Sequence, residues 1–292
     1  MPVVKKKATG AAAGAAPAKK GASAVPLAQP VKVSLPDKLS VPAKDLTAYT
    51  LLIYGEKKIG KTSLAAHFPG ALFLMFEPGG KALEIYQRPV NSWLEFVAYV
   101  DLLEKDTRFQ TIVIDTVDIA YRQCFEAMCR KMAIQHPSDE NDFGKSWGVI
   151  EVEFGKQMAR LAHSKGVLLL SHASVSEIKS RTGESFQYLE PSMPKQAMRY
   201  VTGVVDVWAY YGYLGKERRL LIQGDEFLGA GNRLQETGKF CTPDGKAIVS
   251  IPMGTSSTQA YRNLIAAFDG KQKTVGEDML SPSIIPQKRR PA

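Results

Sequence analysis

The chain has 292 residues, of which 45% are hydrophobic, so it is long enough to bury a substantial core, and we expect a globular protein with tails. Its formal net charge of +9 is concentrated at the ends, because residues 1–44 carry +7 and residues 271–292 carry +3, which leaves −1 for the rest. A broadly basic globular surface is therefore excluded, and any electrostatic binding of a phosphate backbone would come largely from the ends, for which solubilising linkers are the alternative role.

Residues 1–45 consist mainly of Ala, Lys, Pro and Gly and show neither helical nor strand periodicity. Because such a segment buries little apolar surface on folding, we predict a disordered basic tail over 1–45. The sequence becomes β-rich from Thr50, and a basic, Pro-containing stretch returns at Lys271. We therefore predict one folded domain over residues 46–270, followed by a second flexible basic tail over 271–292.

Continuous apolar runs alternate with longer amphipathic stretches between Thr50 and His172. Runs that are continuous, with no polar residue at every second position, are typical of parallel strands that helices cover on both faces. The alternation predicts an α/β fold with a mostly parallel sheet and helices on both faces. The predicted strands are 50–55, 71–77, 111–115 and 166–172, and the predicted helices are 61–67, 92–105, 117–135 and 145–165.

After His172 the sequence changes to a polar stretch that reaches Lys195, and a short helix is predicted near 194–201. The segment that follows, VVDVWAYYGYLGKERRLLIQ, predicts two antiparallel strands that turn at Gly215 and Lys216. This hairpin would be added to the parallel core.

The first apolar run ends in GEKKIGKT, which matches G-x-x-x-x-G-K-[ST], with a strand before it and a helix after it. The glycines let backbone N–H groups converge on phosphate oxygens at a helix N-terminus, where the helix dipole also favours negative charge. We predict an ATP site in which Lys61 neutralises the β- and γ-phosphates and Thr62 offers its hydroxyl to Mg²⁺; an ordinary glycine turn is the alternative. The predicted nucleotide-binding residues are Gly55, Glu56, Lys57, Lys58, Ile59, Gly60, Lys61, Thr62 and Ser63.

Two acidic residues end neighbouring apolar runs. Asp115 follows TIVI and is predicted to hold the hydrated Mg²⁺ together with Thr62, with a helix cap as the alternative. Glu77 ends LFLMFE, at the carboxyl edge where open α/β sheets place their ligands. A carboxylate there can act as general base for the attacking water, whereas the alternative is a turn residue before Pro78.

The run LLLSHA places His172 at the same predicted sheet edge. An imidazole there can donate a hydrogen bond to the γ-phosphate and signal its loss to the following segment. A satisfied surface histidine is the alternative. The remaining histidines, His67, His136 and His163, have no such placement and are assigned no role.

The order GEKKIGKT, then Glu77, then Asp115, then His172 resembles the core of RecA-like P-loop ATPases. The stretch DFGKSWGVIEVEFGKQMARLAHSKGVLLLSH is similar to small phage-encoded members that act in single-strand annealing and recombination, the shortened-core, Sak-type group. The resemblance covers roughly residues 47–233. It implies a RecA-like P-loop NTPase fold and a DNA-stimulated ATP hydrolase that binds single-stranded DNA for annealing or strand exchange.

The resemblance also implies roles for single residues. The glutamate that matches Glu77 is the catalytic base, and the polar residue that matches His172 is the γ-phosphate sensor. The mobile segment after the sensor contacts DNA, which places the predicted DNA loop at residues 173–195; its cations and aromatics suit phosphates and bases, but its three Glu residues make its net charge zero. A surface loop with another partner is the alternative. The predicted DNA-binding residues are Lys179, Arg181, Phe186, Tyr188, Lys195 and Arg199.

RecA-like rings and filaments supply catalytic cations across the subunit boundary, so the resemblance implies a homo-oligomer. RRLLIQGDEFLGAGNRLQ is similar to the segment that ends in a Lys-x-Arg pair in related hexameric ATPases. Arg233 matches the arginine and is the predicted catalytic cation, while Gly231 stands where the lysine is expected. Lys195 and Arg199 are substitutes for that lysine, or solvated helix charges.

Two alternatives share part of this prediction. A hexameric helicase-like or DNA-packaging motor would use the same core. A non-DNA P-loop ATPase switch would regulate a protein partner, and its ATP hydrolysis would be indifferent to single-stranded DNA. For the recombination function, a single-strand DNA-binding protein is a further candidate partner.

The cysteines Cys124, Cys129 and Cys241 show no C-x-x-C spacing, so we predict packing residues in a reducing compartment and no structural zinc. The longest apolar runs, such as 72–76, have only strand length, and the Ala/Gly stretch near the N-terminus is too weakly apolar for a secretory signal. We expect a cytoplasmic protein without a membrane partner, in the bacterial host if the chain is phage-encoded.

Overall fold

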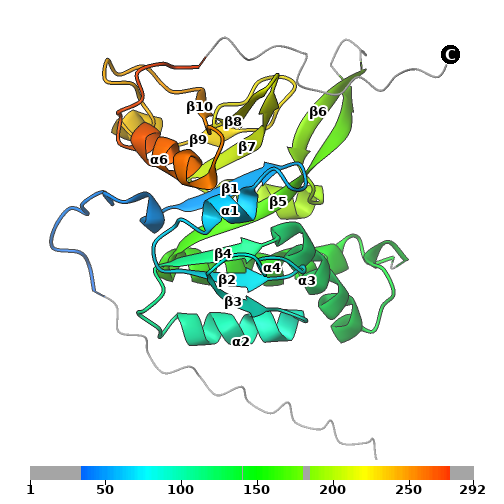
Figure 1. Cartoon of the computed structure of the whole chain (residues 1–292). Coiled ribbons are helices and arrows are strands. Elements are labelled where there is room, and N and C mark those ends of the chain that lie inside the picture. Colours follow the sequence, from blue (N-terminus) through cyan, green and yellow to red (C-terminus); the bar gives the residue numbers. More distant parts are fainter. Residues whose placement is uncertain (1–33, 140, 180–184, 277–292) are drawn as a thin grey trace, which may run out of the picture. The chain divides into compact units, whose positions relative to one another are not determined.

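The structure is a computed structural model that describes residues 34–139, 141–179 and 185–276 (Figure 1). Of the two predicted basic tails, residues 1–33 and 277–292 therefore lie outside the described residues.

Helices and strands fill most of the described chain, and all of them belong to one compact unit, Pro42–Ala292. The strands are β1 (Thr50–Gly55), β2 (Ala71–Met75), β3 (Tyr86–Pro89), β4 (Thr111–Asp115), β5 (Gly166–Lys179), β6 (Ser185–Pro191), β7 (Val207–Leu214), β8 (Glu217–Leu221), β9 (Gly231–Asn232) and β10 (Ser250–Pro252). The helices are α1 (Lys61–Ala65), α2 (Trp93–Leu103), α3 (Val117–Met132), α4 (Lys145–Ser164), α5 (Lys195–Val204) and α6 (Ser257–Phe268), with short 3₁₀ helices η1 (Leu46–Ala48), η2 (Pro137–Asp139) and η3 (Gln235–Thr237).

The main sheet has the strand order β10-β8-β7-β1-β5-β4-β2-β3. The strands from β7 to β3 pair in parallel, whereas β8 and β10 are antiparallel additions at one edge. The turn between β7 and β8 lies at Gly215 and Lys216, as predicted, and Gly215 has a φ of +61°. Glycine adopts this left-handed conformation without the steric cost that other residues meet.

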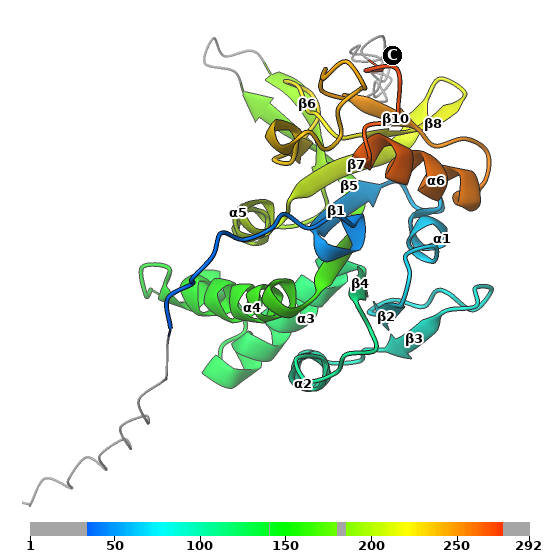
Figure 2. The same ribbon diagram turned by 90° about the vertical axis from the view of Figure 1, so that its left-hand side faces the viewer.

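Consecutive side chains of β1 alternate between two apolar clusters. Leu51 and Ile53 pack with residues of α1 and α6, whereas Leu52 packs with residues of α2, α3, α4 and α5. Because successive side chains of a strand point to opposite faces, both faces of the sheet are buried under helices (Figures 1 and 2). This confirms the predicted α/β fold with a mostly parallel sheet and an added antiparallel hairpin.

The predicted loop over residues 173–195 is instead mostly a β-hairpin. β5 continues beyond the main sheet to Lys179 and pairs with the antiparallel strand β6, from Ala173 opposite Pro191 to Lys179 opposite Ser185. Val175, Ile178, Phe186 and Tyr188 supply the β-branched and aromatic residues that favour strands. Polar residues alternate with them along the sequence, because little of the arm is buried. The segment therefore lacks the continuous apolar run that predicts a core strand.

Several further elements have no counterpart in the predictions. Among them are β3 at one edge of the sheet, β10 at the other, and helix α6. α6 begins at Ser256, whose side chain accepts a hydrogen bond from the backbone N–H of Gln259 and so caps the helix. Beyond α6, the backbone N–H of Val249 donates to the carbonyl of Val275, so the start of the predicted second tail returns along the sheet.

Cys124, Cys129 and Cys241 are buried and free, in agreement with their predicted packing role. In the described part of the chain, no helix combines the length and the apolar character needed to cross a bilayer.

The fold places the candidate site. The carboxyl ends of β1, β5, β4 and β2 are adjacent along one edge of the sheet, with Gly55 opposite His172 and Met75 opposite Asp115. The predicted residues at these strand ends are therefore brought together by strand order alone, as is usual for ligand sites in open α/β sheets.

Replacing Gly166 with alanine tests the packing at the start of β5. A Cβ at Gly166 would lie 1.6 Å from the carbonyl oxygen of Thr47, so the backbone must move. We expect Gly166→Ala to lower the free energy of unfolding by about 1–3 kcal/mol, as overpacking commonly does.

Gly203→Ala in α5 is the control, since its Cβ meets nothing within 4 Å. It should stabilise the protein by about 0.5–1 kcal/mol. Urea unfolding that gave Gly166→Ala the stability of the unchanged protein would contradict this packing.

Candidate active site

A pocket of about 380 Å³ opens at the carboxyl edge of the parallel strands. It joins the loop after β1 to the ends of β2, β4 and β5, as the strand order requires. Its lining contains most of the predicted nucleotide-binding residues, both predicted metal ligands, the predicted base and the predicted sensor. The lining residues are Lys57, Lys58, Gly60, Lys61, Thr62, Ser63, Glu77, Pro78, Asp115 and His172.

Both glycines of the GEKKIGKT loop meet a steric requirement. At Gly55 a Cβ would lie 2.0 Å from the carbonyl oxygen of Tyr211, because β7 passes directly beside the end of β1. At Gly60 the φ is +108°, a left-handed conformation that side chains rarely tolerate. The loop can therefore turn sharply and present the first N–H groups of α1 toward the pocket.

Lys61 lies at the start of α1 and is only 7% exposed. Its Nζ donates hydrogen bonds to the carbonyl oxygens of Gly55 and Glu56 at 2.8 and 2.9 Å. Burial lowers the pKa of Lys61, while the nearby carboxylates, Asp115 foremost, act in the opposite direction. The ammonium group is thus held over the loop, where it can attract a bound anion.

Thr62 and Asp115 connect the loop helix to β4. The Thr62 hydroxyl donates a 2.7 Å hydrogen bond to Asp115 Oδ2. Burial raises the pKa of Asp115, which is 3% exposed, and the hydrogen bond from Thr62 partly offsets this. Within the described ranges, no group of three or more His, Cys, Asp or Glu side chains is arranged to hold a metal. One carboxylate and one hydroxyl fit Mg²⁺, which usually keeps phosphate oxygens and water as its other ligands.

Glu77 and His172 face each other across the pocket. His172 Nε2 lies 3.6 Å from Glu77 Oε1, and His172 Nδ1 lies 2.8 Å from Asp118 Oδ2. Asp118 stands in the first turn of α3, and its side chain is 10% exposed. The carbonyl oxygen of His172 also accepts a 2.8 Å hydrogen bond from the backbone N–H of Ser192, just after β6. The imidazole is therefore fixed from the side away from Glu77.

Two residues of this neighbourhood are absent from the sequence-based predictions. Asp118 follows Asp115 by three residues, and this second acid after TIVID is the signal that could have found it. Arg218 in β8 flanks the loop on its other side, 3.6 Å from the Cβ position of Gly60, and its Nε donates to the carbonyl of Gly254. Its position depends on the register of the β7–β8 pairing, and no sequence signal indicates it.

Arg233, the predicted cation across the subunit boundary, lies outside the pocket of its own chain. Its guanidinium donates to the carbonyl oxygens of Gly203 and Val205, and its Nε lies 3.6 Å from Asp206 Oδ1. These contacts join Arg233, just after β9, to the segment between the end of α5 and the start of β7. A role toward a neighbouring subunit stays a prediction.

The predicted DNA-binding residues that the structure describes lie on three elements, β5, β6 and α5. The Phe186 ring packs edge-on against Phe227 at 5.8 Å, and burial raises the pKa of Tyr188. Arg199 in α5 pairs with Glu151 at 2.5 Å, while Lys195 is exposed at the start of the same helix. Lys179 is the last described residue of β5, and Arg181 lies outside the described residues.

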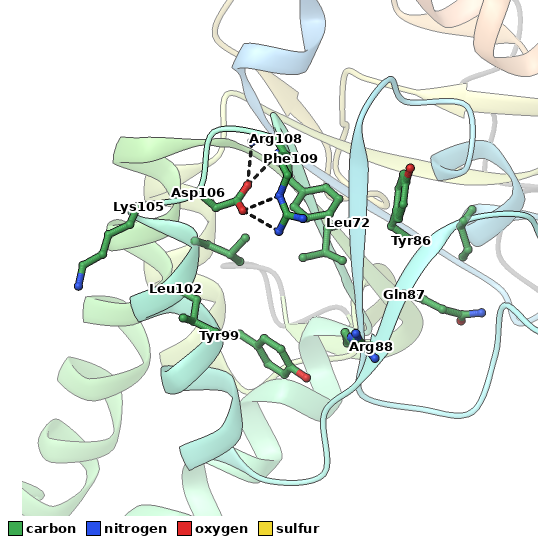
Figure 3. Close-up of a pocket in the computed structure, with 12 residues that line it drawn as sticks. Leu72, Tyr86, Gln87, Arg88, Tyr99, Leu102, Lys105, Asp106, Arg108 and Phe109 are labelled. Carbon is green, nitrogen blue, oxygen red and sulfur yellow. Dashed lines mark hydrogen bonds and ion pairs between the residues drawn. The ribbon is translucent and has the colours of Figure 1, made fainter.

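A larger cavity, of about 830 Å³, lies between α2 and the edge strand β3 (Figure 3). Arg108 is paired there with Asp106 at 2.8 Å and sits over the ring of Phe109. Leu72, Tyr99 and Leu102 add apolar surface. None of the predicted nucleotide or metal residues lines this cavity, so size alone does not identify the site.

Comparison with known proteins identifies a family and a similar protein. A family model described as AAA domain matches residues 47–234. The chain is also similar to the SPbeta prophage-derived uncharacterized protein YorG of Bacillus subtilis (strain 168), with 29% identity over 144 residues. The aligned region covers 47% of this chain and 45% of that relative, so the chain spans less than half the relative's length.

Replacing Asp115 with asparagine separates stability from ligand binding. Because burial raises the pKa of Asp115, its ionised form opposes folding at neutral pH. This cost arises as the pH passes upward through the unfolded-state pKa, near 4, and disappears below it. We expect Asp115→Asn to be the more stable protein at pH 7, with the difference shrinking toward pH 4 in thermal unfolding.

The same variant should gain less from Mg²⁺ and ATP together. A ligand at about a hundred times its Kd stabilises a protein by about 2.7 kcal/mol, and Asp115→Asn should lose part of this gain. Asp139→Asn, at an exposed residue, is the matched control and should change neither quantity. Equal stabilisation of both variants by Mg²⁺ and ATP would remove Asp115 from the metal site.

Proposed function

The chain belongs to the AAA domain family, which makes it a nucleotide-hydrolysing P-loop ATPase, and on this premise we propose that it hydrolyses Mg²⁺-bound ATP and couples hydrolysis to single-stranded DNA. The observation that carries the proposal is the meeting of four features in one pocket: the GEKKIGKT loop, the Thr62–Asp115 hydrogen bond, Glu77 and His172.

Phosphate binding rests on the loop and on Lys61. Phosphate oxygens would compete with the carbonyls of Gly55 and Glu56 for the Lys61 ammonium group and would accept hydrogen bonds from the N–H groups at the start of α1. Thr62 and Asp115 would hold Mg²⁺, which would supply positive charge to offset the negative charge that develops on the phosphates.

Glu77 is the proposed general base. Its carboxylate takes a proton from a water molecule while the water oxygen forms a bond to the γ-phosphorus. The bond from the γ-phosphorus to the bridging oxygen breaks, and ADP and phosphate are the products. Glu77 lines the pocket and is the carboxylate nearest His172 Nε2, so it stands beside the group that is proposed to contact the γ-phosphate.

His172 is the proposed γ-phosphate sensor. Nδ1 lies within hydrogen-bond distance of Asp118 Oδ2, which orients the ring and leaves Nε2 to face a phosphate. The backbone bond from Ser192 to His172 connects this sensor to the end of the β5–β6 hairpin.

Single-stranded DNA is the proposed partner, with annealing or strand exchange by a phage-type, RecA-like homo-oligomer of the Sak type as the outcome. The arm of β5 and β6 leaves the main sheet one residue after His172, and the similar protein of Bacillus subtilis is prophage-derived. The zero net charge of residues 173–195 argues against purely electrostatic capture. In the same proposal, Arg233 acts across the subunit boundary, and a single-strand DNA-binding protein is a possible additional partner.

ATP hydrolysis with and without single-stranded DNA tests the proposal. We expect DNA to stimulate the unchanged protein, and Glu77→Gln to lower the rate at least about a hundredfold while nucleotide binding is kept, since general-base catalysis contributes about 10²–10⁴. Glu84→Gln, in the same connection between β2 and β3, is the matched control and should keep its rate.

Each outcome separates a part of the proposal. A full rate for Glu77→Gln would remove Glu77 as the base. Hydrolysis that ignores DNA would leave the ATPase and favour a switch that acts on a protein partner. Stimulation that vanishes when residues 1–33 are deleted would assign DNA binding to the basic tail.

A further inference from the structure

A third cavity lies directly behind the proposed sensor. It measures about 450 Å³ and is formed by one face of α3, the segment between α3 and α4, the first turns of α4, and the residues after β6. The lining residues are Asp118, Ile119, Tyr121, Arg122, Phe125, His136, Trp147, Ser192 and Pro194. This volume is in the range of small-molecule sites.

Aromatic rings form one wall of this cavity. Phe125, His136 and Trp147 lie with their ring centroids 5.4–5.7 Å apart, and all three rings are only partly buried. Asp142 anchors the start of α4 just before Trp147, because its carboxylate accepts hydrogen bonds from the N–H groups of Gly144 and Ser146. The rings are tilted or nearly perpendicular to one another, at interplanar angles of 45–82°, and a single partly exposed ring face suits stacking against another planar ring.

Two residues of the cavity lining carry buried polar atoms without a hydrogen-bond partner among the described residues. Asp118 Oδ2 is bonded to His172, but Asp118 Oδ1 is buried with no hydrogen-bond partner among the described residues. Tyr121 also lines the cavity, and its buried hydroxyl has no partner there either. A buried carboxylate oxygen without a donor is costly, so the site favours a ligand that brings an N–H group. Arg122, with a side chain 68% exposed, offers a cation for a phosphate.

We propose that this cavity binds one unstacked nucleobase of single-stranded DNA and that the bound base controls the γ-phosphate sensor. Adenine, cytosine and guanine each carry an amino group that can donate to Asp118 Oδ1 while the ring stacks on the aromatic wall. The proposal rests on the proposed function and specifies how bound DNA would act on the nucleotide site.

The coupling passes through two contacts of His172. Asp118 holds its Nδ1, and Ser192 holds its carbonyl oxygen, and both residues line the base cavity. A base that donates to Asp118 Oδ1 restricts the carboxylate and so orients the imidazole toward the γ-phosphate and Glu77. Asp118 is therefore a positioning residue, and DNA stimulation should depend on bases as well as on phosphates.

The segment before α4 extends this surface. Phe143 is 96% exposed and has a φ of +56°, an uncommon conformation for an aromatic residue, and Lys145 beside it is exposed. An exposed ring and a cation four and two residues before Trp147 suit a neighbouring base and its phosphate.

The test compares oligo(dC) with an abasic oligomer of the same length, which keeps the phosphates and lacks the bases. We expect oligo(dC) to stimulate ATP hydrolysis by the full chain far more than the abasic oligomer does. Trp147→Ala should weaken oligo(dC) binding by roughly 5- to 150-fold, the range for loss of one stacked base, and should remove most of the difference between the two oligomers. Tyr86→Ala, at a ring 67% exposed and outside this cavity, is the matched control and should keep the difference.

Two further variants distinguish a lost contact from a damaged fold. Trp147→Phe keeps a ring, so it should keep base-dependent stimulation. Asp118→Asn can still accept from His172, but its amide N–H₂ would face the base amino group. In that variant, oligo(dC) and the abasic oligomer should stimulate equally, whatever its rate without DNA.

The outcomes are distinct. Equal stimulation of the unchanged protein by both oligomers would overturn the base site and leave the proposed function standing. Stimulation by neither would overturn the proposed function itself. Stimulation by free dCMP as strong as that by oligo(dC) would show a free-nucleotide effector site and overturn the assignment to DNA.

Discussion

The hydrogen bond between Thr62 and Asp115 is the constraint on which the site depends. It requires β4 to end beside the first turn of α1, although β5 separates β4 from β1 in the sheet. The same order places His172 opposite Gly55 and so between the loop and Asp115 along the sheet edge. Burial raises the pKa of Asp115 and lowers that of Lys61, so two charges are held at a cost that a phosphate and a cation could repay.

The sequence predicts the parallel core well, because strands such as β1 and β4 are continuous apolar runs that both faces of the sheet bury. It also predicts that Lys61, Thr62, Glu77, Asp115 and His172 lie close together, and they line one pocket because the ends of adjacent parallel strands converge. It fails for the β5–β6 hairpin, whose residues are mostly polar because little of the arm is buried. Asp118 and Arg218 escape prediction because their contacts depend on helix rotation and strand register, which no local pattern encodes.

His172 lines the site and contacts two residues that line the cavity behind it, Asp118 and Ser192. Glu77 faces one nitrogen of His172, Asp118 holds the other, and Ser192 holds its backbone. A bound ligand on either side of His172 would therefore reorient the same imidazole ring. No large domain motion is needed to couple the two sides. Because the contacts are short, small changes in side-chain orientation are sufficient for this coupling. The β5–β6 arm and the segment before α4 supply the surfaces that a strand of DNA would contact.

Titration of the protein with a non-hydrolysable ATP analogue and Mg²⁺ tests the central claim, that residues 55–62 hold a triphosphate. The account predicts saturable binding by the unchanged protein and a loss of affinity of at least about tenfold in Lys61→Ala, because hydrogen bonds to charged groups contribute about 1.5–3 kcal/mol. Lys81→Ala, at an exposed lysine outside the pocket, should bind as the unchanged protein does. Absence of binding, or equal binding by Lys61→Ala, would contradict the account.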